Sequence, residues 1–235
     1  MTTGINICYN HCMNGMKALK AQSAYSRPER PTNFITYVLA AGLSFVGLVF
    51  LLIKAVPLGP SAVAGASVFG VGSFCVFCIG ALAHILPFCR AKYALIGIAR
   101  NAASLLVCFA FAPVALYGLG GGTFADAVWG AALFAVAAAC AVGACALTVG
   151  AADEYKLVRL FLYVVIVLAC TVRSALIAEL AGLGAFWFFI GGGAMYILGC
   201  VCGAWDALPA RHCVMHLFFM CGAALHFVCA YVYVL

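Results

Sequence analysis

Seven long apolar runs constrain the fold of this chain more than any other feature of its sequence. Each run holds more than twenty residues, and a helix of about 20 apolar residues crosses the roughly 30 Å hydrocarbon core of a bilayer. Strands of a membrane β-barrel would alternate apolar and polar residues over about ten positions, which these runs do not. The sequence therefore predicts an all-α polytopic membrane protein, a bundle of seven transmembrane helices. The runs are Phe34–Val56, Ala62–Leu86, Tyr93–Tyr117, Phe124–Val149, Leu157–Ala178, Leu183–Trp205 and His212–Leu235.

The composition excludes a soluble fold. Of the 235 residues, 68% are hydrophobic and only 8% are charged, whereas about a quarter of a soluble domain is charged. We therefore expect an integral, multi-pass membrane protein whose main partner is the lipid bilayer, in either the plasma membrane or an internal membrane. The net charge of +6 is typical of basic cytoplasmic loops, and we expect no binding to nucleic acid.

Lysine and arginine residues predict the orientation of the bundle, because cytoplasmic loops carry an excess of them. If the N-terminus is cytoplasmic, the outer loops hold only Lys54 and Arg173. We therefore expect a polar cytoplasmic tail over residues 1–33, one membrane domain over residues 34–235 and an external C-terminus. The cytoplasmic segments then hold Lys17, Lys20, Arg27, Arg30, Arg90, Lys92, Lys156, Arg159 and Arg211.

Three histidines fall at one depth in this topology, near the cytoplasmic face. His84 closes the second run, and His212 and His216 open the last one. A spacing of four residues puts His212 and His216 on one face of a helix. One histidine near an interface is usually a polar anchor, but three at the same depth favour a metal site. Three imidazoles leave a fourth position for water, and zinc suits such a set, so His84, His212 and His216 are the predicted Zn²⁺ ligands.

Arg100 is the one residue that is clearly ionisable in mid-span, about two turns into the third run. An arginine inside the bilayer normally faces the bundle interior or a wet cavity. There it would lie near the histidines and contact an anionic head group or a carboxylate. The alternative is that its long side chain reaches back to the interface. Both readings stay open at the level of sequence.

Other residues with metal-ligand chemistry have simpler explanations. His226 lies fourteen residues after His212, about 21 Å further along a helix, and we expect it to pack or to anchor the helix. Cys8, His11 and Cys12 are close enough in sequence to bind a metal, but they lie in the predicted tail, and a disordered tail is the favoured interpretation.

Three segments of the chain resemble motifs of a known family. They are Arg30–Tyr37 before the first run, Gly192–Gly199 in the sixth run and Arg211–Phe227 in the last run. Together they resemble the haemolysin III family, within the progestin and adiponectin receptor superfamily. The resemblance covers residues 29 to 235.

This resemblance implies a seven-helix bundle with a cytoplasmic N-terminus and a zinc ion held by three histidines, which map onto His84, His212 and His216. In the adiponectin-receptor branch, the zinc site is associated with hydrolysis of lipid amides, ceramide in particular. Two positions depart from the family pattern: Gly80 stands where the family has a serine, and Ala99 where it has an aspartate.

The departures leave open whether the chain is an enzyme. A zinc hydrolase commonly uses a carboxylate to orient or deprotonate water, and the third run contains no acidic residue, so Asp206 or another group would have to substitute. One hypothesis is a zinc-dependent hydrolase of a lipid amide or ester. A second is a receptor or scaffold with a structural zinc, closed by a thiolate from Cys78, Cys89 or Cys213. A third, a pore or transporter, is disfavoured because a chain of intramembrane charges is lacking.

Overall fold

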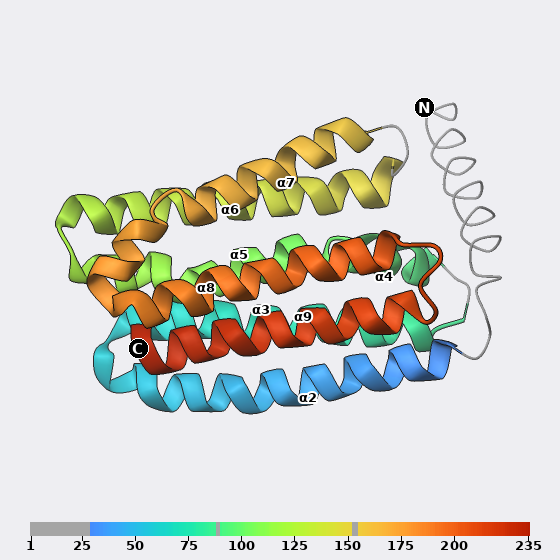
Figure 1. The fold of residues 1–235 in the computed structure, drawn as a ribbon, viewed down its shortest axis with the longest axis horizontal. Coiled ribbons are helices and arrows are strands. Elements are labelled where there is room, and N and C mark those ends of the chain that lie inside the picture. The colour runs from blue at the N-terminus through green and yellow to red at the C-terminus, as the bar shows by residue number, and fades with distance from the viewer. Residues whose placement is uncertain (1–28, 88–89, 152–154) are drawn as a thin grey trace, which may run out of the picture.

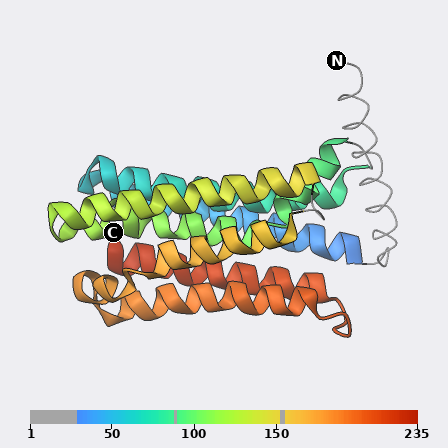
Figure 2. The ribbon, with the colours of Figure 1, turned by 90° about the horizontal axis from the view of Figure 1, so that it is seen from above.

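The helices run side by side along one long axis (Figure 1, Figure 2). The computed structural model describes residues 29–87, 90–151 and 155–235. Six helical segments in this part of the chain are long and apolar enough to cross a membrane, which confirms an all-α polytopic membrane protein. The helices are α2 (Glu29–Ala55), α3 (Pro60–Ile85), α4 (Arg90–Ala99), α5 (Ala102–Leu116), α6 (Phe124–Ala151), α7 (Lys156–Thr171), α8 (Ser174–Ala204) and α9 (Arg211–Val228), with short helical turns at Val56–Leu58, Gly118–Gly121 and Cys229–Val234.

The first helix begins earlier than predicted. α2 starts at Glu29, inside the tail expected over residues 1–33. Pro31 falls in its first turn, where a proline costs the helix no internal hydrogen bond. Cys8, His11 and Cys12 lie outside the described residues.

The third apolar run was expected to form one continuous helix. In the structure this helix is broken at Arg100 and Asn101. The backbone N–H of Asn101 donates to the carbonyl of Ile98, and the side-chain amide of Asn101 donates to the carbonyl of Gly97 at 2.8 Å. An asparagine that bonds locally to backbone competes with the helical pattern. The break therefore lies where one polar side chain enters an apolar segment.

The fifth run, predicted as Leu157–Ala178, also differs in the structure. Its helix α7 ends at Thr171, and α8 begins at Ser174. The apolar part of α7, Leu157–Thr171, is shorter than the six segments that are long enough to cross a membrane, so the seven predicted spans are not all found in the described residues. Within α8, Gly182 has φ 87° and ψ 162°, so the expected boundary between the fifth and sixth runs is found at this glycine.

Close approach between helices depends on glycine, as small residues allow in lipid. A Cβ atom on Gly70 of α3 would lie 2.5 Å from the Leu48 side chain of α2. Elsewhere on α3, a Cβ atom on Gly65 would lie 2.8 Å from the backbone of Pro113 in α5. α3 is therefore held tightly between α2 and α5.

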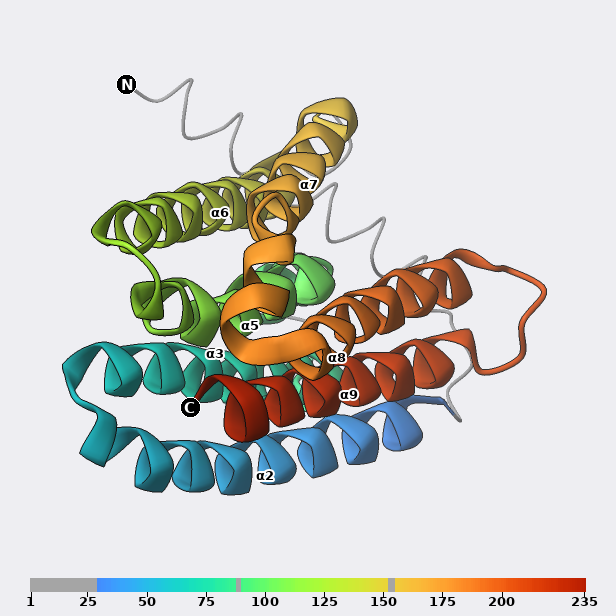
Figure 3. The same cartoon turned by 60° about the vertical axis from the view of Figure 1, so that its left-hand side comes forward.

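α2, α3 and α9 pack together on one side of the bundle, and α6 and α7 pair on the other (Figure 3). Large apolar side chains are exposed along the outer face of α2, among them Leu39, Leu43 and Phe50. A surface of this kind is stable against lipid rather than water. The outer faces therefore fit a bilayer environment.

Candidate functional site

The end of α3 and the start of α9 bring two of the predicted histidines together. The ring centroids of His84 and His216 are 5.8 Å apart, with an interplanar angle of 70°. His216 is 4% exposed, and His84 and His212 are half-buried. His212 lies one helical turn before His216 on α9. These three residues are called the histidine cluster below.

His216 has the chemistry of a metal ligand. Both its Nδ1 and Nε2 atoms are buried without a hydrogen-bond partner, although buried polar atoms are nearly always paired. Within the described residues, no group of three or more His, Cys, Asp or Glu side chains is close enough to hold a metal ion. The donor set thus fits zinc in its chemistry, but the three imidazoles would have to draw closer to share one ion.

Tyr37 on α2 is part of this site, although it received no role from the sequence alone. Its ring centroid lies 4.1 Å from that of His216 and 5.6 Å from that of His84, and the residue is 3% exposed. Asn33 lies one turn earlier, also buried, with an unpartnered Oδ1 atom. This pair has the same four-residue spacing as His212 and His216, which puts it on one face of α2; that spacing was the signal in the sequence.

Gly80 provides the space that Tyr37 fills. It lies one turn before His84 on α3, and a Cβ atom built there would be 2.5 Å from Cζ of the Tyr37 ring. Real Cβ atoms do not come this close to other side chains. Any side chain at position 80 would therefore displace the tyrosine ring.

Arg100 does not point into the bundle. Its side chain is exposed at the end of α4, which favours the interfacial alternative over the interior one. The adjacent Asn101 is the residue that turns inward, with 1% exposure.

Asn101 is the centre of a second polar group, the Asn101 cluster (Asn101, Thr148, Arg159 and Tyr163). The Asn101 amide donates to the Thr148 hydroxyl at 3.1 Å, and the Tyr163 hydroxyl donates to Asn101 Oδ1. Arg159 donates to the Thr148 hydroxyl at 3.2 Å. These contacts join the α4–α5 break to α6 and α7. The sequence pattern gave no sign of them, because the partners are distant along the chain.

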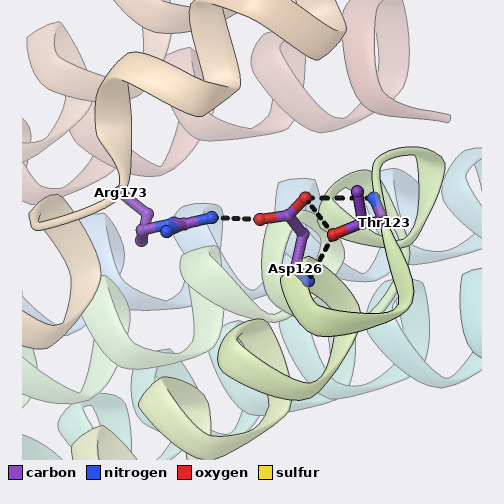
Figure 4. A network of polar contacts seen from close by, with 3 residues as sticks. All are labelled: Thr123, Asp126 and Arg173. Carbon is purple, nitrogen blue, oxygen red and sulfur yellow. Dashed lines mark hydrogen bonds and ion pairs between the residues drawn. The ribbon is translucent and has the colours of Figure 1, made fainter.

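A third polar group lies at the beginning of α6 (Figure 4). The Thr123 amide donates to Asp126 Oδ2 at 3.0 Å, and the Asp126 amide donates to the Thr123 hydroxyl at 3.2 Å. This reciprocal pattern caps a helix. Arg173, in the α7–α8 junction, forms an ion pair with the same carboxylate. The group stabilises the start of α6 and ties it to that junction.

His226 packs among rings, as predicted. It is 2% exposed, stacked on Tyr196 with centroids 5.3 Å apart, and meets the edge of Phe189 at 5.2 Å. Gly192 leaves room for its ring, because a Cβ atom there would lie 2.6 Å from the imidazole.

Asp206, the carboxylate considered as a substitute for the missing family aspartate, is 92% exposed and forms an ion pair with Arg211. Arg211 immediately precedes His212 at the start of α9. An acidic side chain is therefore present at the same end of the bundle as the histidine cluster. It forms no hydrogen bond with His216 in the described part of the chain.

An apolar cavity of about 330 Å³ lies between α2, α3 and α9, a size at the lower end of ligand pockets. Ala40 and Phe77 line it, and the Phe77 ring is 6.3 Å from that of Tyr37. Among the described residues that line the cavity, Ser73 has the one buried hydroxyl group without a hydrogen-bond partner. The cavity thus adjoins the histidine cluster through Tyr37 and Phe77.

The fold and this site define an integral, multi-pass, all-α membrane protein. No model of a protein family matches the chain. It is 28% identical over 209 residues to Hemolysin-3 of Bacillus cereus, covering 88% of this chain and 92% of that protein. It is 27% identical over 207 residues to a Hemolysin-3 homologue of Bacillus subtilis (strain 168), covering 87% and 94%. Over most of its length, the chain is therefore similar to these Hemolysin-3 proteins.

Proposed function

We propose that this protein binds one zinc ion through His84, His212 and His216, near the cytoplasmic face of its membrane. The observation that carries the proposal is His216, whose two buried nitrogens lack partners beside the ring of His84 at 5.8 Å. When bound, zinc supplies Lewis-acid polarisation of a carbonyl group. His84, His212 and His216 would hold the ion, and the burial of His216 would keep water away from its side of the site.

The proposal includes a seven-span topology with a cytoplasmic N-terminus. The support is the distribution of basic residues: Arg90, Lys92, Lys156, Arg159 and Arg211 lie at the histidine end, against Lys54 and Arg173 at the opposite end. In this topology α7 would be the seventh span; its apolar part is shorter than the six segments long enough to cross a membrane, and a short span is accommodated by local thinning of the bilayer. A protease added outside intact cells should leave an N-terminal tag uncut, and its digestion would invert this topology.

Hydrolysis of a lipid amide or ester is a second candidate function of the same site. Two observations favour it: the apolar cavity beside Tyr37 suits the hydrocarbon part of a lipid, and Asp206 holds a carboxylate at the histidine end. The third span offers no acidic residue, so Asp206 is the residue that would orient water in this mechanism.

The decisive experiment is zinc stoichiometry on protein purified in detergent. We expect about one zinc per wild-type chain and none in a variant with alanine at His84, His212 and His216. His226→Ala is the matched control, because it removes a buried histidine of the same helix outside the cluster, and its zinc should be unchanged. Wild-type protein without zinc would overturn the proposal.

Two further variants separate the roles that zinc would have. Cys213→Ser should retain zinc if the fourth position is open, and loss of zinc would indicate a structural site closed by this thiolate. Hydrolysis of a fluorescent ceramide by the zinc-loaded protein, lost in Asp206→Asn with zinc retained, would support the second candidate. A zinc-loaded protein with no turnover would exclude it for that substrate.

A further inference from the structure

Three rings from three different helices meet at the histidine cluster. Tyr37 comes from α2, His84 from α3 and His216 from α9. The tyrosine ring is the shared neighbour, with centroid distances of 4.1 Å to His216 and 5.6 Å to His84. Because Tyr37 contacts both imidazoles, a movement of its ring changes the surroundings of both.

The position of the Tyr37 ring is itself determined by its neighbours. On one side it lies over Gly80, where even a methyl group would overlap with it. Behind it stands Phe77, one turn earlier on α3, at 6.3 Å. With 3% exposure, the ring has little freedom to turn away. Buried side chains in such close packing keep one rotamer.

We infer that Tyr37 is a positioning residue of the zinc site: its ring, seated over Gly80, holds His84 and His216 in the orientation in which they face each other. The inference rests on the proposed function, since it assigns the two histidines to one metal ion. Mutation of residues that orient metal-binding histidines typically weakens metal binding by about 10–100-fold. Tyr37 would act through packing of its ring, without bonding to the metal.

The test is zinc affinity, measured by competition with a chromophoric chelator. Tyr37→Leu should weaken zinc binding about tenfold or more, and Tyr37→Phe, which keeps the ring, should bind as the wild type does. Cobalt substituted for zinc should show a changed absorption spectrum in Tyr37→Leu and an unchanged one in Tyr37→Phe. A structural contribution alone would not move this spectrum.

Tyr196→Leu is the matched control. Tyr196 is also a fully buried tyrosine that stacks on a histidine of α9, but that histidine is His226. This variant should lose stability without losing zinc affinity. If Tyr37→Leu binds zinc as tightly as the wild type, or if Tyr196→Leu loses as much affinity, the inference is overturned.

The packing of the Tyr37 ring against Gly80 is tested by a variant on α3. Gly80→Ala should weaken zinc binding by pushing the ring aside, whereas Gly193→Ala, at a helical glycine with open space around it, should not. Gly80→Ala combined with Tyr37→Leu should be no weaker than Tyr37→Leu alone, because residues in contact are not additive. Additive losses would show that Gly80 and Tyr37 act separately.

A measurement on metal-free protein distinguishes failure of the inference from failure of the proposed function. Diethyl pyrocarbonate should modify His216 faster in Tyr37→Leu than in the wild type, and at the wild-type rate in Tyr196→Leu. Wild-type protein without zinc would refute the proposed function, and the labelling rates would still decide whether Tyr37 covers His216. Equal labelling in all three proteins would refute the positioning role.

Discussion

The histidine cluster and the Asn101 cluster are built alike but differ in whether their buried polar atoms have partners. Both lie toward the same end of the bundle (Figure 1): the histidine cluster joins α3 to α9, and the Asn101 cluster joins the α4–α5 break to α6 and α7. In the Asn101 cluster, the asparagine side chain bonds to backbone, to Thr148 and to Tyr163. In the histidine cluster, both ring nitrogens of His216 lack a partner.

The difference separates a polar group that stabilises the fold from one that is available to a ligand. A buried polar atom without a hydrogen bond costs about 1–3 kcal/mol, so a chain gains nothing in stability from keeping His216 as it is. Lack of a partner is not sufficient by itself: His226 also has an unpartnered Nδ1 atom, but it lies among Tyr196 and Phe189 rather than beside a second histidine. The adjacent His84 is what distinguishes His216.

The largest effect is expected for His216→Ala. Loss of this ligand should reduce zinc affinity by more than about 100-fold, beyond the range for orienting residues. The metal-free protein should lose only the packing of the ring, because no hydrogen bond of the imidazole is broken. Zinc titration and thermal unfolding in detergent, with and without a chelator, measure the two effects. A metal-free protein that unfolds much more easily than the wild type would mean that His216 is a packing residue.

The next effect is expected for Asn101→Leu, and it should have the opposite character. The variant removes the bonds of Asn101 to Gly97 and Thr148 and leaves the half-buried Tyr163 hydroxyl without its acceptor, which should lower the free energy of unfolding by about 2 kcal/mol. Zinc affinity should stay at the wild-type value. Denaturant unfolding and zinc titration of the same preparation check both parts, and a parallel loss of zinc would show that the two clusters are coupled.

Much of the fold follows from apolarity along the chain, but the helix break at Asn101 does not. Apolar residues continue on both sides of Arg100 and Asn101, so hydropathy predicts one continuous span. The break depends on Thr148 and Tyr163, which are 47 and 62 residues away. Pairings of this kind are properties of the packed bundle, and a single sequence does not contain them in readable form.

The site shows the same division. His84, His212 and His216 were predicted from spacing and from the orientation that basic residues imply, and the structure places His84 beside His216. Tyr37 could not be predicted in the same way, because its role depends on Gly80 of the neighbouring helix. The lack of a side chain at Gly80 can be interpreted only when the register of α2 against α3 is known, because that register places Tyr37 over the glycine.

A smaller effect is expected for Tyr163→Phe, which sharpens the comparison by removing one hydrogen bond of the Asn101 cluster and no ring. The free energy of unfolding should fall by about 1 kcal/mol, within the range for a hydrogen bond between transmembrane helices. Combined with Asn101→Leu, the loss should be less than the sum of the two, because both variants remove the same contact. A full additive loss would mean that the two side chains do not bond in the membrane.

The smallest effect is expected for Arg173→Gln, at the start of α6 rather than at the histidine end (Figure 4). The arginine side chain is 37% exposed, and exposed ion pairs contribute little to stability. Asp126 keeps both its hydrogen bonds to Thr123 in this variant, so the cap of α6 remains. The unfolding temperature should therefore change less than in Tyr163→Phe, and zinc affinity should not change, as measured by the same two assays.

Thr123→Val is the companion variant, because it breaks the cap and spares the ion pair, and it should be the more destabilising of the two. The reverse order would mean that the link between α6 and the α7–α8 junction matters more to the bundle than the helix cap, and that polar contacts at this end are as structural as those of the Asn101 cluster.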